Sequence, residues 1–427
     1  MRGDNTNMKI LLVNKFHYIK GGSETYYFGL GELLKEKGHE VIYFSMKDDR
    51  NFPCGQEGYF TEHMDFNGKM DKIPMLQTGM KILYSREAKK KISALIQKEK
   101  PDVVHLNLFQ RQLTHSIIDA VTKYHIPIVY TAHDLNCICP NYMMLTHGNI
   151  CEACKSGHYG ACFRNQCVKD SSVKSLLSAA EAYLYKWKKT YQKIDLFITP
   201  SDFYKRKIEE AAITTSPVIH MKNFLPAKSV YQAVQENDSY FLYFGRLSKE
   251  KGIMTMLKAY QESGLENQLY LAGSGDLEDE IQQYISCHQL KERIRLMGFL
   301  SGEVLQRIVQ RAKCIVLPSE WYENGPYTIM EAMAQGKPVI VSSNGGLPEI
   351  VENGETGYIA RPKDTASLAE CMKKMAGLSR EEYRIMGEKA VANAKRDFDA
   401  DQYLKNLVQY YEQVRRSYGK NRSSNIT

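Results

Sequence analysis

Hydrophobic residues occur along this chain in two alternating arrangements. Short apolar runs rich in β-branched residues are followed by longer segments in which apolar side chains recur every three or four positions. The first arrangement is typical of buried strands and the second of amphipathic helices. Their alternation predicts βαβ units, and therefore parallel sheets that are covered by helices.

The strand-like runs fall into two groups, one in each half of the chain. In the first half, strands are predicted at 10–14, 41–45, 103–107, 128–132 and 196–200, and helices at 23–37 and 112–124. In the second half, strands are predicted at 240–244, 269–272, 294–297, 314–318 and 339–342, and helices at 380–396 and 400–418. Two such groups in tandem predict an α/β fold with two Rossmann-like, doubly wound parallel-sheet domains that face a cleft.

A polar, irregular stretch that contains Pro226 separates the two groups and is interpreted as a linker. The predicted domains are 8–221 on the N-terminal side, with a cysteine-rich insertion at about 137–167, and 222–397 on the C-terminal side. Residues 398–418 are predicted to form a helix that packs back on the N-terminal domain, and residues 419–427 a disordered tail.

The composition indicates a globular protein but does not identify its function. The 427 residues are 43% hydrophobic and 25% charged, as in ordinary globular proteins. A formal net charge of +8 suits anionic partners, whether nucleotide phosphates, acidic lipids or nucleic acid. No apolar run reaches the ~18 residues that span a bilayer, and Met1–Asn7 lacks the apolar core of a signal peptide. The chain is therefore expected in the cytoplasm, free or peripheral at the inner face of the membrane.

The strongest candidate for chemistry is a pair of glutamates, Glu323 and Glu331, separated by seven residues. The first lies in a loop with Gly325 and Pro326 after a predicted strand, and the second lies in the first turns of the next helix. Free backbone N–H groups and the helix dipole at such a turn favour an anionic ligand. The carboxylates can accept hydrogen bonds from the hydroxyl groups of a sugar. The alternative is that both glutamates only cap the helix. The pair and its loop together favour ligand binding over helix capping.

A basic turn follows the first strand of the second half and contains Arg246 and Lys251. Arginine can bind a phosphate with two hydrogen bonds and lysine adds a point charge, so the two can neutralise a diphosphate leaving group. The alternative is a solvated basic turn. The turn lies at the carboxyl end of a strand, upstream of the glutamate pair, and this position favours phosphate binding.

Glycine turns and one histidine follow other predicted strands. Gly273, Ser274 and Gly275 follow one strand of the second half, and Gly298 and Phe299 follow the next. Glycine lets backbone approach a ligand, although 273–275 could equally be a tight turn with Asp276 as the helix cap. In the first half, Gly21 and Gly22 precede a helix N-terminus that suits a phosphate. The dinucleotide fingerprint is absent, which excludes a dehydrogenase.

His133 ends the predicted strand 128–132 and is followed by Asp134. A lone histidine is more often structural. At the carboxyl end of a strand, however, an imidazole can donate a hydrogen bond to a substrate hydroxyl, and we predict that His133 does so with Asp134 in support.

These motifs, in the order in which they occur along the chain, resemble those of family 4 of the retaining glycosyltransferases, which have the GT-B fold. The match runs from about Lys9 to Arg396. The stretch from Glu323 to Glu331 resembles the family's Glu-x7-Glu motif, with Asn324-Gly-Pro-Tyr where Gly-Phe-Gly is usual. The resemblance implies that Glu323 holds the donor sugar and Glu331 the ribose, and that backbone near 326–328 faces sugar or phosphate.

The same resemblance assigns the other motifs. Arg246 and Lys251 match the family's diphosphate clamp, and the loop 273–275 is placed near the nucleoside. The catalytic residues so implied are His133, Glu323, Arg246 and Lys251. The implied donor-binding residues are Gly21, Gly22, Gly273, Ser274, Gly275, Gly298, Phe299, Gly325, Pro326, Tyr327, Thr328 and Glu331.

The predicted function is therefore that of a retaining glycosyltransferase of the hexosyltransferase type. It would move a sugar from a nucleotide-diphosphate donor to a glycan or lipid-linked acceptor in cell-surface polysaccharide synthesis. No Asp-x-Asp motif occurs in a fitting place, so no cofactor is expected to be required for the chemistry. An epimerase or hydrolase of the same fold is the alternative. A zinc-containing nucleic-acid-binding protein would leave the glutamate pair without a role, so no nucleic-acid partner is predicted.

Six of the ten cysteines lie between Cys137 and Cys167. Four of them, Cys151, Cys154, Cys162 and Cys167, can supply the thiolates of a structural zinc site, with Cys137 and Cys139 as alternates. Disulfides are disfavoured in a reducing cytosol, and the alternative is a set of reduced thiols or redox-linked pairs.

Two basic segments, 81–100 and 168–193, combine lysines with aromatic residues. Such a helical face suits an anionic membrane surface. The alternative is a solvated charged face over an apolar core stripe.

Overall fold

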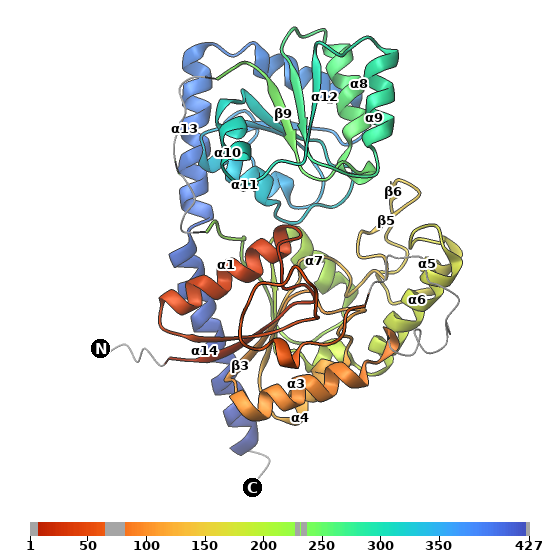
Figure 1. Cartoon of the computed structure of the whole chain (residues 1–427), viewed down its shortest axis with the longest axis vertical. Coiled ribbons are helices and arrows are strands. Elements are labelled where there is room, and N and C mark those ends of the chain that lie inside the picture. Colours follow the sequence, from red (N-terminus) through yellow and green to blue (C-terminus); the bar gives the residue numbers. More distant parts are fainter. Residues whose placement is uncertain (1–6, 65–81, 227–230, 232–236, 424–427) are drawn as a thin grey trace. The chain divides into compact units, whose positions relative to one another are not determined.

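The computed structural model of the chain describes residues 7–64, 82–226, 231 and 237–423 (Figure 1). They form two compact units. The first comprises the described parts of Met1–Thr146, Cys151–Met221 and Ala400–Thr427, and the second those of His147–Ile150 and Lys222–Asp399. Lys81, most of the predicted linker and residues 424–427 of the predicted tail lie outside the described residues.

The first unit is built on one parallel sheet. Its strands are β1 (Lys9–Val13), β2 (Glu40–Phe44), β3 (Val103–Leu106), β4 (Ile128–Thr131), β7 (Leu196–Thr199) and β8 (Val218–His220). The order across the sheet is β2-β1-β3-β4-β7-β8. Every residue of β3, β4 and β7 is buried, as expected of a sheet with covered faces.

Helices of the first unit are α1 (Gly22–Glu36), α3 (Arg86–Glu99), α4 (Ser116–Lys123), α5 (Gly160–Arg164), α6 (Ser172–Trp187), α7 (Asp202–Ala211) and α14 (Ala400–Ser423). Helix α14 packs against α1, and two of its tyrosines are buried in this unit. The Tyr403 hydroxyl lies 2.7 Å from the Tyr26 hydroxyl, and the Tyr411 hydroxyl lies 2.5 Å from Nδ1 of His105. Since α14 continues to Ser423, part of the predicted tail is helical.

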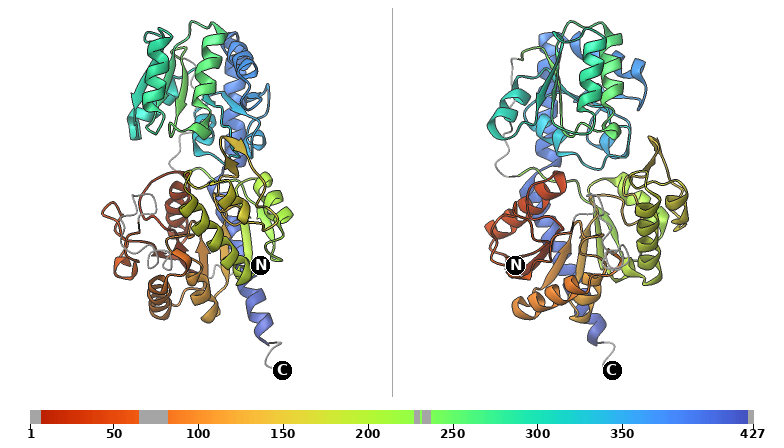
Figure 2. Two further views of the ribbon diagram at one scale, coloured as in Figure 1. Left: turned by 90° about the vertical axis from the view of Figure 1, so that its right-hand side faces the viewer. Right: turned by 45° about the vertical axis from the view of Figure 1, so that its right-hand side comes forward.

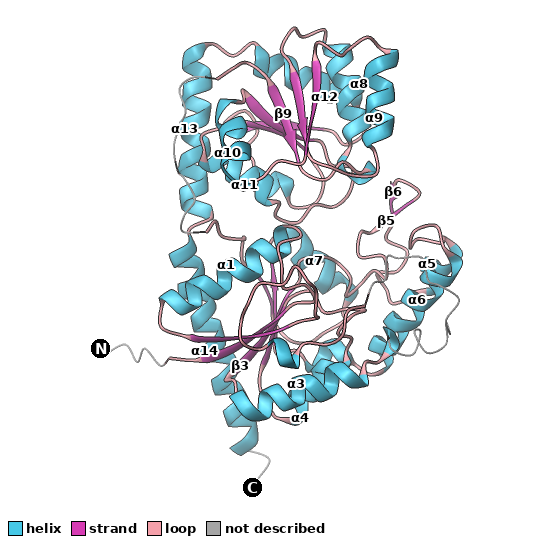
Figure 3. Ribbon diagram, viewed as in Figure 1, coloured by secondary structure: helices cyan, strands magenta, loops and turns pink. Residues whose placement is uncertain are grey.

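The second unit is built on a second parallel sheet (Figure 3). Its strands are β9 (Phe241–Phe244), β10 (Leu269–Ala272), β11 (Ile294–Gly298), β12 (Cys314–Leu317), β13 (Val339–Ser342) and β14 (Gly357–Ala360). Its helices are α8 (Ile253–Ser263), α9 (Glu278–Cys287), α10 (Gly302–Arg311), α11 (Tyr327–Ala334), α12 (Thr365–Ala376) and α13 (Arg380–Asp397). Figure 1 shows α8, α9 and α12 on one side of this sheet and α10, α11 and α13 on the other. The predicted α/β fold with two doubly wound sheets is confirmed.

Each sheet has a point at which its strand order reverses. The order β11-β10-β9-β12-β13-β14 reverses between β9 and β12, and in the first sheet the reversal lies between β1 and β3. Loops that leave neighbouring strands at such a point run in opposite directions, and ligands of doubly wound sheets bind there at the carboxyl ends of the strands. The candidate site residues should therefore be sought on the loops after these four strands.

Three local predictions were wrong or incomplete. The helix predicted from residue 112 begins at Ser116, because Arg111 and Thr114 have positive φ values of 70° and 61° and form a tight turn. Asp276 does not cap α9, which starts at Glu278 after Leu277, without a side-chain cap. Strand β8, and the hairpin of β5 (Leu145–Thr146) and β6 (Asn149–Ile150), were not predicted because runs of two or three residues carry little periodicity. Strand β14 was not predicted either.

Candidate functional site

Three loops at the carboxyl ends of β9, β10 and β12 are fastened to one another. The Leu247 N–H donates to the Ser274 carbonyl at 2.9 Å, and the Glu320 N–H donates to the Glu250 carbonyl at 2.8 Å. A Cβ at Gly273 would lie 1.8 Å from the Gly245 oxygen, and one at Gly275 would lie 2.2 Å from the Leu247 oxygen. These two glycines are therefore required for packing of loop against loop, which is a role that the sequence did not indicate.

Glu323 is the centre of the second unit's site. Its side chain is buried, and its Oε1 atom accepts hydrogen bonds from Lys251 Nζ at 2.6 Å, Ser319 Oγ at 2.5 Å and Trp321 Nε1 at 2.8 Å. Burial acts to raise the pKa of Glu323, but the charge of Lys251 and the three donors hold that pKa below its usual value. Pro326 is the N-cap of α11, with no side-chain hydrogen bond, so the helix-capping alternative for Glu323 is wrong.

Arg246 and Lys251 share the loop after β9 but differ in environment. The Lys251 side chain is 15% exposed and forms the ion pair with Glu323. The Arg246 side chain is 64% exposed, and its nearest carboxylate oxygen, on Glu250, lies 3.8 Å away. The guanidinium therefore remains accessible to a ligand, whereas the lysine is already held in place.

Glu331 lies on α11 beside a pocket. The lining residues of this pocket include Phe244 at the end of β9, Leu305 and Val309 on α10, and Gln335. Among the described residues, no side chain donates a hydrogen bond to the Glu331 carboxylate. Burial alone raises the pKa of Glu331 to about 7. An unpaired carboxylate in a pocket is a group that a ligand's hydroxyls could satisfy.

The other donor-binding residues predicted in the second half of the chain lie on the same edge of the second sheet or at the start of α11. The Gly273 N–H donates to the Gly298 carbonyl at 2.7 Å, and the Phe299 side chain is 74% exposed. The Gly325 carbonyl accepts from Asn223 Nδ2 at 3.1 Å. Tyr327 and Thr328 are the first two residues of α11, and Tyr327 is buried.

Several residues of this edge were not found from the sequence. Ser342 Oγ and Asn344 Nδ2 both donate to the Ser319 carbonyl, at 2.5 Å and 3.2 Å, and fix the loop that carries Glu323. The Gly346 N–H donates to the Glu323 carbonyl at 2.7 Å. These residues follow β13, so the rule that pointed to the other strand ends could have found them.

The first unit carries a second network at its own reversal point. Asn14, directly after β1, donates from Nδ2 to Glu24 Oε1 at 3.1 Å and accepts the Leu108 N–H at 3.0 Å. Ser23 Oγ also donates to Glu24 Oε1, and burial raises the pKa of this carboxyl. Gly21 is the N-cap of α1, and both Gly21 and Gly22 are exposed. The sequence had singled out the glycines but neither Asn14 nor Glu24.

His133 lies in the same unit, after β4. Its Nε2 atom lies 2.9 Å from Oδ1 of Asn107, which follows β3, and its ring contacts that of Tyr26 edge-on at 4.8 Å. Burial lowers the pKa of His133 to about 3, so the imidazole is neutral at physiological pH. The predicted supporting residue, Asp134, accepts the Asn136 N–H at 2.9 Å, and the charges near it are those of Lys15 and Arg111. Asn107 is thus a support of His133 that the sequence did not reveal.

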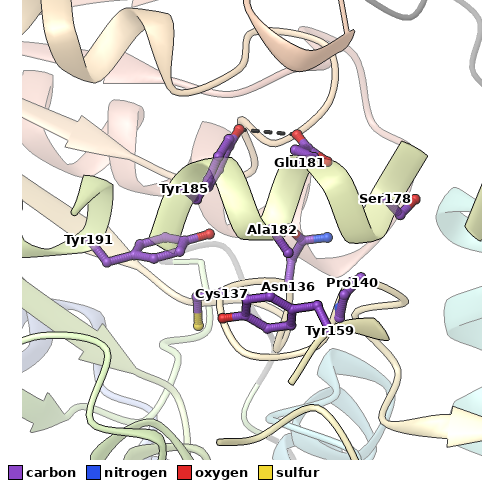
Figure 4. Close-up of a pocket in the computed structure, with 9 residues that line it drawn as sticks. All are labelled: Asn136, Cys137, Pro140, Tyr159, Ser178, Glu181, Ala182, Tyr185 and Tyr191. Carbon is purple, nitrogen blue, oxygen red and sulfur yellow. Dashed lines mark hydrogen bonds between the residues drawn. The ribbon is translucent and has the colours of Figure 1, made fainter. Parts of the chain in front are cut away.

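The cysteine-rich segment contains free thiols. Cys154, Cys162 and the partly buried Cys167 pack in one cluster with Tyr159 and Ala179. Cys137 lines a small pocket with Tyr159, Tyr185 and Tyr191 (Figure 4), in which Tyr185 donates to Glu181 at 3.1 Å. Within the described ranges, no three His, Cys, Asp or Glu side chains are placed so that they could hold a metal ion. The zinc site, whether of Cys151, Cys154, Cys162 and Cys167 or with Cys137 and Cys139 as alternates, stays a prediction.

No helix among the residues that the structure describes is long and apolar enough to cross a bilayer.

Two family models match this chain. Residues 20–224 match the model described as Glycosyltransferase Family 4, and residues 227–392 match that described as Glycosyl transferases group 1. An uncharacterized glycosyltransferase of Methanocaldococcus jannaschii is 35% identical over 188 residues, which cover 42% of this chain and 46% of that protein. An amylovoran biosynthesis glycosyltransferase of Erwinia amylovora is 29% identical over 171 residues, covering 38% and 41%. The match thus spans less than half the length of either relative.

Solved structures with the same fold match over nearly the whole chain. Sucrose-phosphate synthase from Thermosynechococcus elongatus superposes with a TM-score of 0.70 at 20% identity, over 96% of this chain and 99% of that one. Anabaena HepE in complex with UDP and glucose superposes with a TM-score of 0.67 at 16% identity, over 95% and 100%. The two family models and the fold together show that this chain belongs to family 4 of the glycosyltransferases, with the GT-B fold.

Proposed function

We propose that this chain transfers a sugar from a nucleotide-diphosphate donor, which its second unit binds. The observation that carries the proposal is the Lys251–Glu323 ion pair, 2.6 Å long, at the point where the strand order of the second sheet reverses. Doubly wound sheets bind their ligands at this point. A buried ion pair contributes little net stability, so its presence here is better explained by a ligand than by the fold.

The carboxylates of Glu323 and Glu331 have oxygen atoms that can accept further hydrogen bonds. Oε1 of Glu323 receives three hydrogen bonds, while Oε2 receives none from any described residue. We assign Oε2 to a hydroxyl of the donor sugar and the unpaired carboxylate of Glu331 to the ribose, as the family resemblance implies. Lys251 would then fix the orientation of Glu323 as well as supply charge.

The leaving group is a nucleoside diphosphate, on which negative charge develops as the glycosidic bond breaks. The exposed guanidinium of Arg246 and the ammonium of Lys251 supply positive charge for it, and preorganised electrostatic stabilisation of this kind is usually the largest catalytic term. Because HepE is solved with UDP and glucose, uridine-diphosphate sugars are the first donors to test.

The acceptor is assigned to the first unit, where neutral groups predominate. His133 is neutral and held by Asn107, so it can hydrogen-bond to a hydroxyl without adding charge. We propose that the acceptor oxygen attacks the anomeric carbon on the face from which the diphosphate leaves. The acceptor proton passes to a diphosphate oxygen, and the anomeric configuration is retained. Retention rests on the family resemblance.

The acceptor itself is proposed to be a glycan or a lipid-linked sugar in polysaccharide synthesis. The support is the relative from Erwinia amylovora, which is named for amylovoran biosynthesis.

The proposal is tested with the purified full chain and a panel of nucleotide sugars. The true donor should raise the unfolding temperature, because a ligand that binds only the folded state stabilises it. Glu323→Gln should remove transfer, whereas the matched control Glu280→Gln, an exposed glutamate on α9, should behave as wild type. Release of nucleoside diphosphate should require the acceptor. Equal release without any acceptor would instead favour a hydrolase of the same fold.

A further inference from the structure

Helix α6 carries apolar side chains on the face that points away from its own core. Val173, Leu176, Tyr183 and Trp187 are 40%, 52%, 44% and 77% exposed. Their spacings of three, seven and four residues place them on one stripe along the helix. The opposite face is buried, and includes Ser175, Ser178, Ala179, Glu181 and Tyr185. An ordinary surface helix has the reverse arrangement, with polar groups outward.

The segment that carries this stripe is basic. Between residues 160 and 190 the chain has six lysines and arginines and two acidic residues, one of which is the buried Glu181. Lys186 and Lys188 lie on either side of Trp187 in the sequence, and Lys174 and Lys189 form no ion pair with any described residue. Lys188 lies 3.9 Å from Asp119, and Lys186 donates to the Gly157 carbonyl. The surface therefore combines exposed apolar groups with positive charge that is only partly paired.

The stripe lies on a preformed surface. Figures 1 and 2 show α5 beside α6 at the rim of the first unit. The Tyr183 ring contacts that of Tyr159 edge-on at 5.3 Å, and its hydroxyl accepts the Gly160 N–H at 3.1 Å. Phe163 on α5 is a further apolar side chain, 43% exposed. Binding through α6 would therefore need no refolding of the helix pair.

We propose that the exposed face of α6 docks this protein on the surface of an anionic lipid bilayer. Leu176 and Trp187 would enter the boundary between headgroups and acyl chains, and the lysines would contact lipid phosphates. A soluble polyanion would engage the lysines but leave the apolar stripe in water. A bilayer surface satisfies both. The proposal does not depend on which sugar is transferred, although a lipid-linked acceptor would lie in the same surface.

The test is cosedimentation of the full chain with vesicles, without nucleotide sugar, so that the result is independent of the transfer reaction. One vesicle preparation is phosphatidylcholine alone and the other contains about one third phosphatidylglycerol. The wild-type chain should bind the anionic vesicles, and more weakly as salt is raised. Leu176→Ser/Trp187→Ser should weaken this binding by about tenfold or more. Lys174→Glu/Lys189→Glu should weaken it at low salt in particular.

Matched controls come from exposed residues of the second unit. Val304→Ser removes an apolar group that is 49% exposed on α10, and Lys258→Glu/Lys373→Glu reverses two exposed charges. These controls should bind vesicles as wild type does, and all variants should unfold at the wild-type temperature. Failure of the wild type to bind anionic vesicles, or equal binding by the α6 variants, would overturn the proposal. So would a concentration-dependent dimer that Leu176→Ser/Trp187→Ser disrupts while vesicle binding persists, because the stripe would then belong to an interface between two copies.

Discussion

The two units bury ionisable side chains at equivalent edges of their sheets, yet the consequences are opposite. In the first unit, burial raises the pKa values of Glu24 and Asp134 and lowers those of Lys15 and His133, so each is moved toward its neutral form. In the second unit, the pKa of the buried Glu323 is lowered, whereas that of Glu331, which has no cation beside it among the described residues, is raised to about 7. The pKa of Glu323 is lowered because the Lys251 ammonium lies at hydrogen-bond distance from its carboxylate. The second edge thus keeps charge at the Lys251–Glu323 pair, which suits a diphosphate, and the first holds neutral hydrogen-bonding groups, which suit an acceptor hydroxyl.

The largest effect is expected from breaking the charge pair. Lys251→Met leaves Glu323 buried without its cation, which should destabilise the second unit by about 3 kcal/mol or more and abolish transfer. Lys251→Met/Glu323→Gln should recover most of that stability but no activity. Thermal unfolding and turnover measured on the three variants separate the two effects. If Lys251→Met alone unfolded at the wild-type temperature, the ion pair would not have the electrostatic role described here.

A smaller effect on turnover is expected from changing His133 in the first unit. His133→Ala should reduce turnover by about 10²-fold, while His133→Gln, whose amide oxygen can still accept a hydrogen bond as the neutral imidazole does, should retain more. Because the pKa of His133 is about 3, turnover should show no loss from imidazole protonation between pH 6 and 8. A pH profile that changed on His133→Gln in this range would show instead that the histidine carries a proton in the reaction.

Glu331 should give a several-fold pH effect on donor binding. Its pKa is raised to about 7 in the free protein, so the neutral carboxyl predominates below pH 7 and the carboxylate above it. The carboxylate is the better acceptor for ribose hydroxyls, so donor affinity should rise between about pH 6 and pH 8. Titration calorimetry at several pH values measures this, and Glu331→Gln should remove the dependence. An equal slope in that variant would place the titrating group elsewhere.

The smallest effect on transfer is expected from the cysteine segment, for which a structural role is predicted. If it holds structural zinc, purified protein should contain about one metal ion per chain, and a chelator should lower the unfolding temperature by a few degrees without altering donor affinity. Metal analysis under reducing conditions decides the question. A zinc content near zero would leave the thiols as packing groups, as Cys154 and Cys162 are in the apolar cluster.

The architecture could be predicted from the sequence because its strongest signals are local. Buried parallel strands appear as apolar runs, and Glu323, Arg246 and Lys251 each follow such a run. What could not be predicted depends on contacts between distant segments. Asn107 reaches His133 across 26 positions, and Ser342 reaches the Ser319 carbonyl across 23. Pattern along the chain places residues at the end of a strand but does not reveal which neighbour they contact.

The fastening of loop to loop in the second unit has a consequence for how donor preference could change. With Gly273 and Gly275 against neighbouring backbone, a side chain at either position would push two loops apart rather than adjust a contact with the donor. Variation in specificity must therefore come from groups that project from this rigid edge, among which Arg246 and Phe299 are exposed. If the proposed donor is confirmed, libraries intended to change donor preference should randomise such positions and leave the glycines untouched.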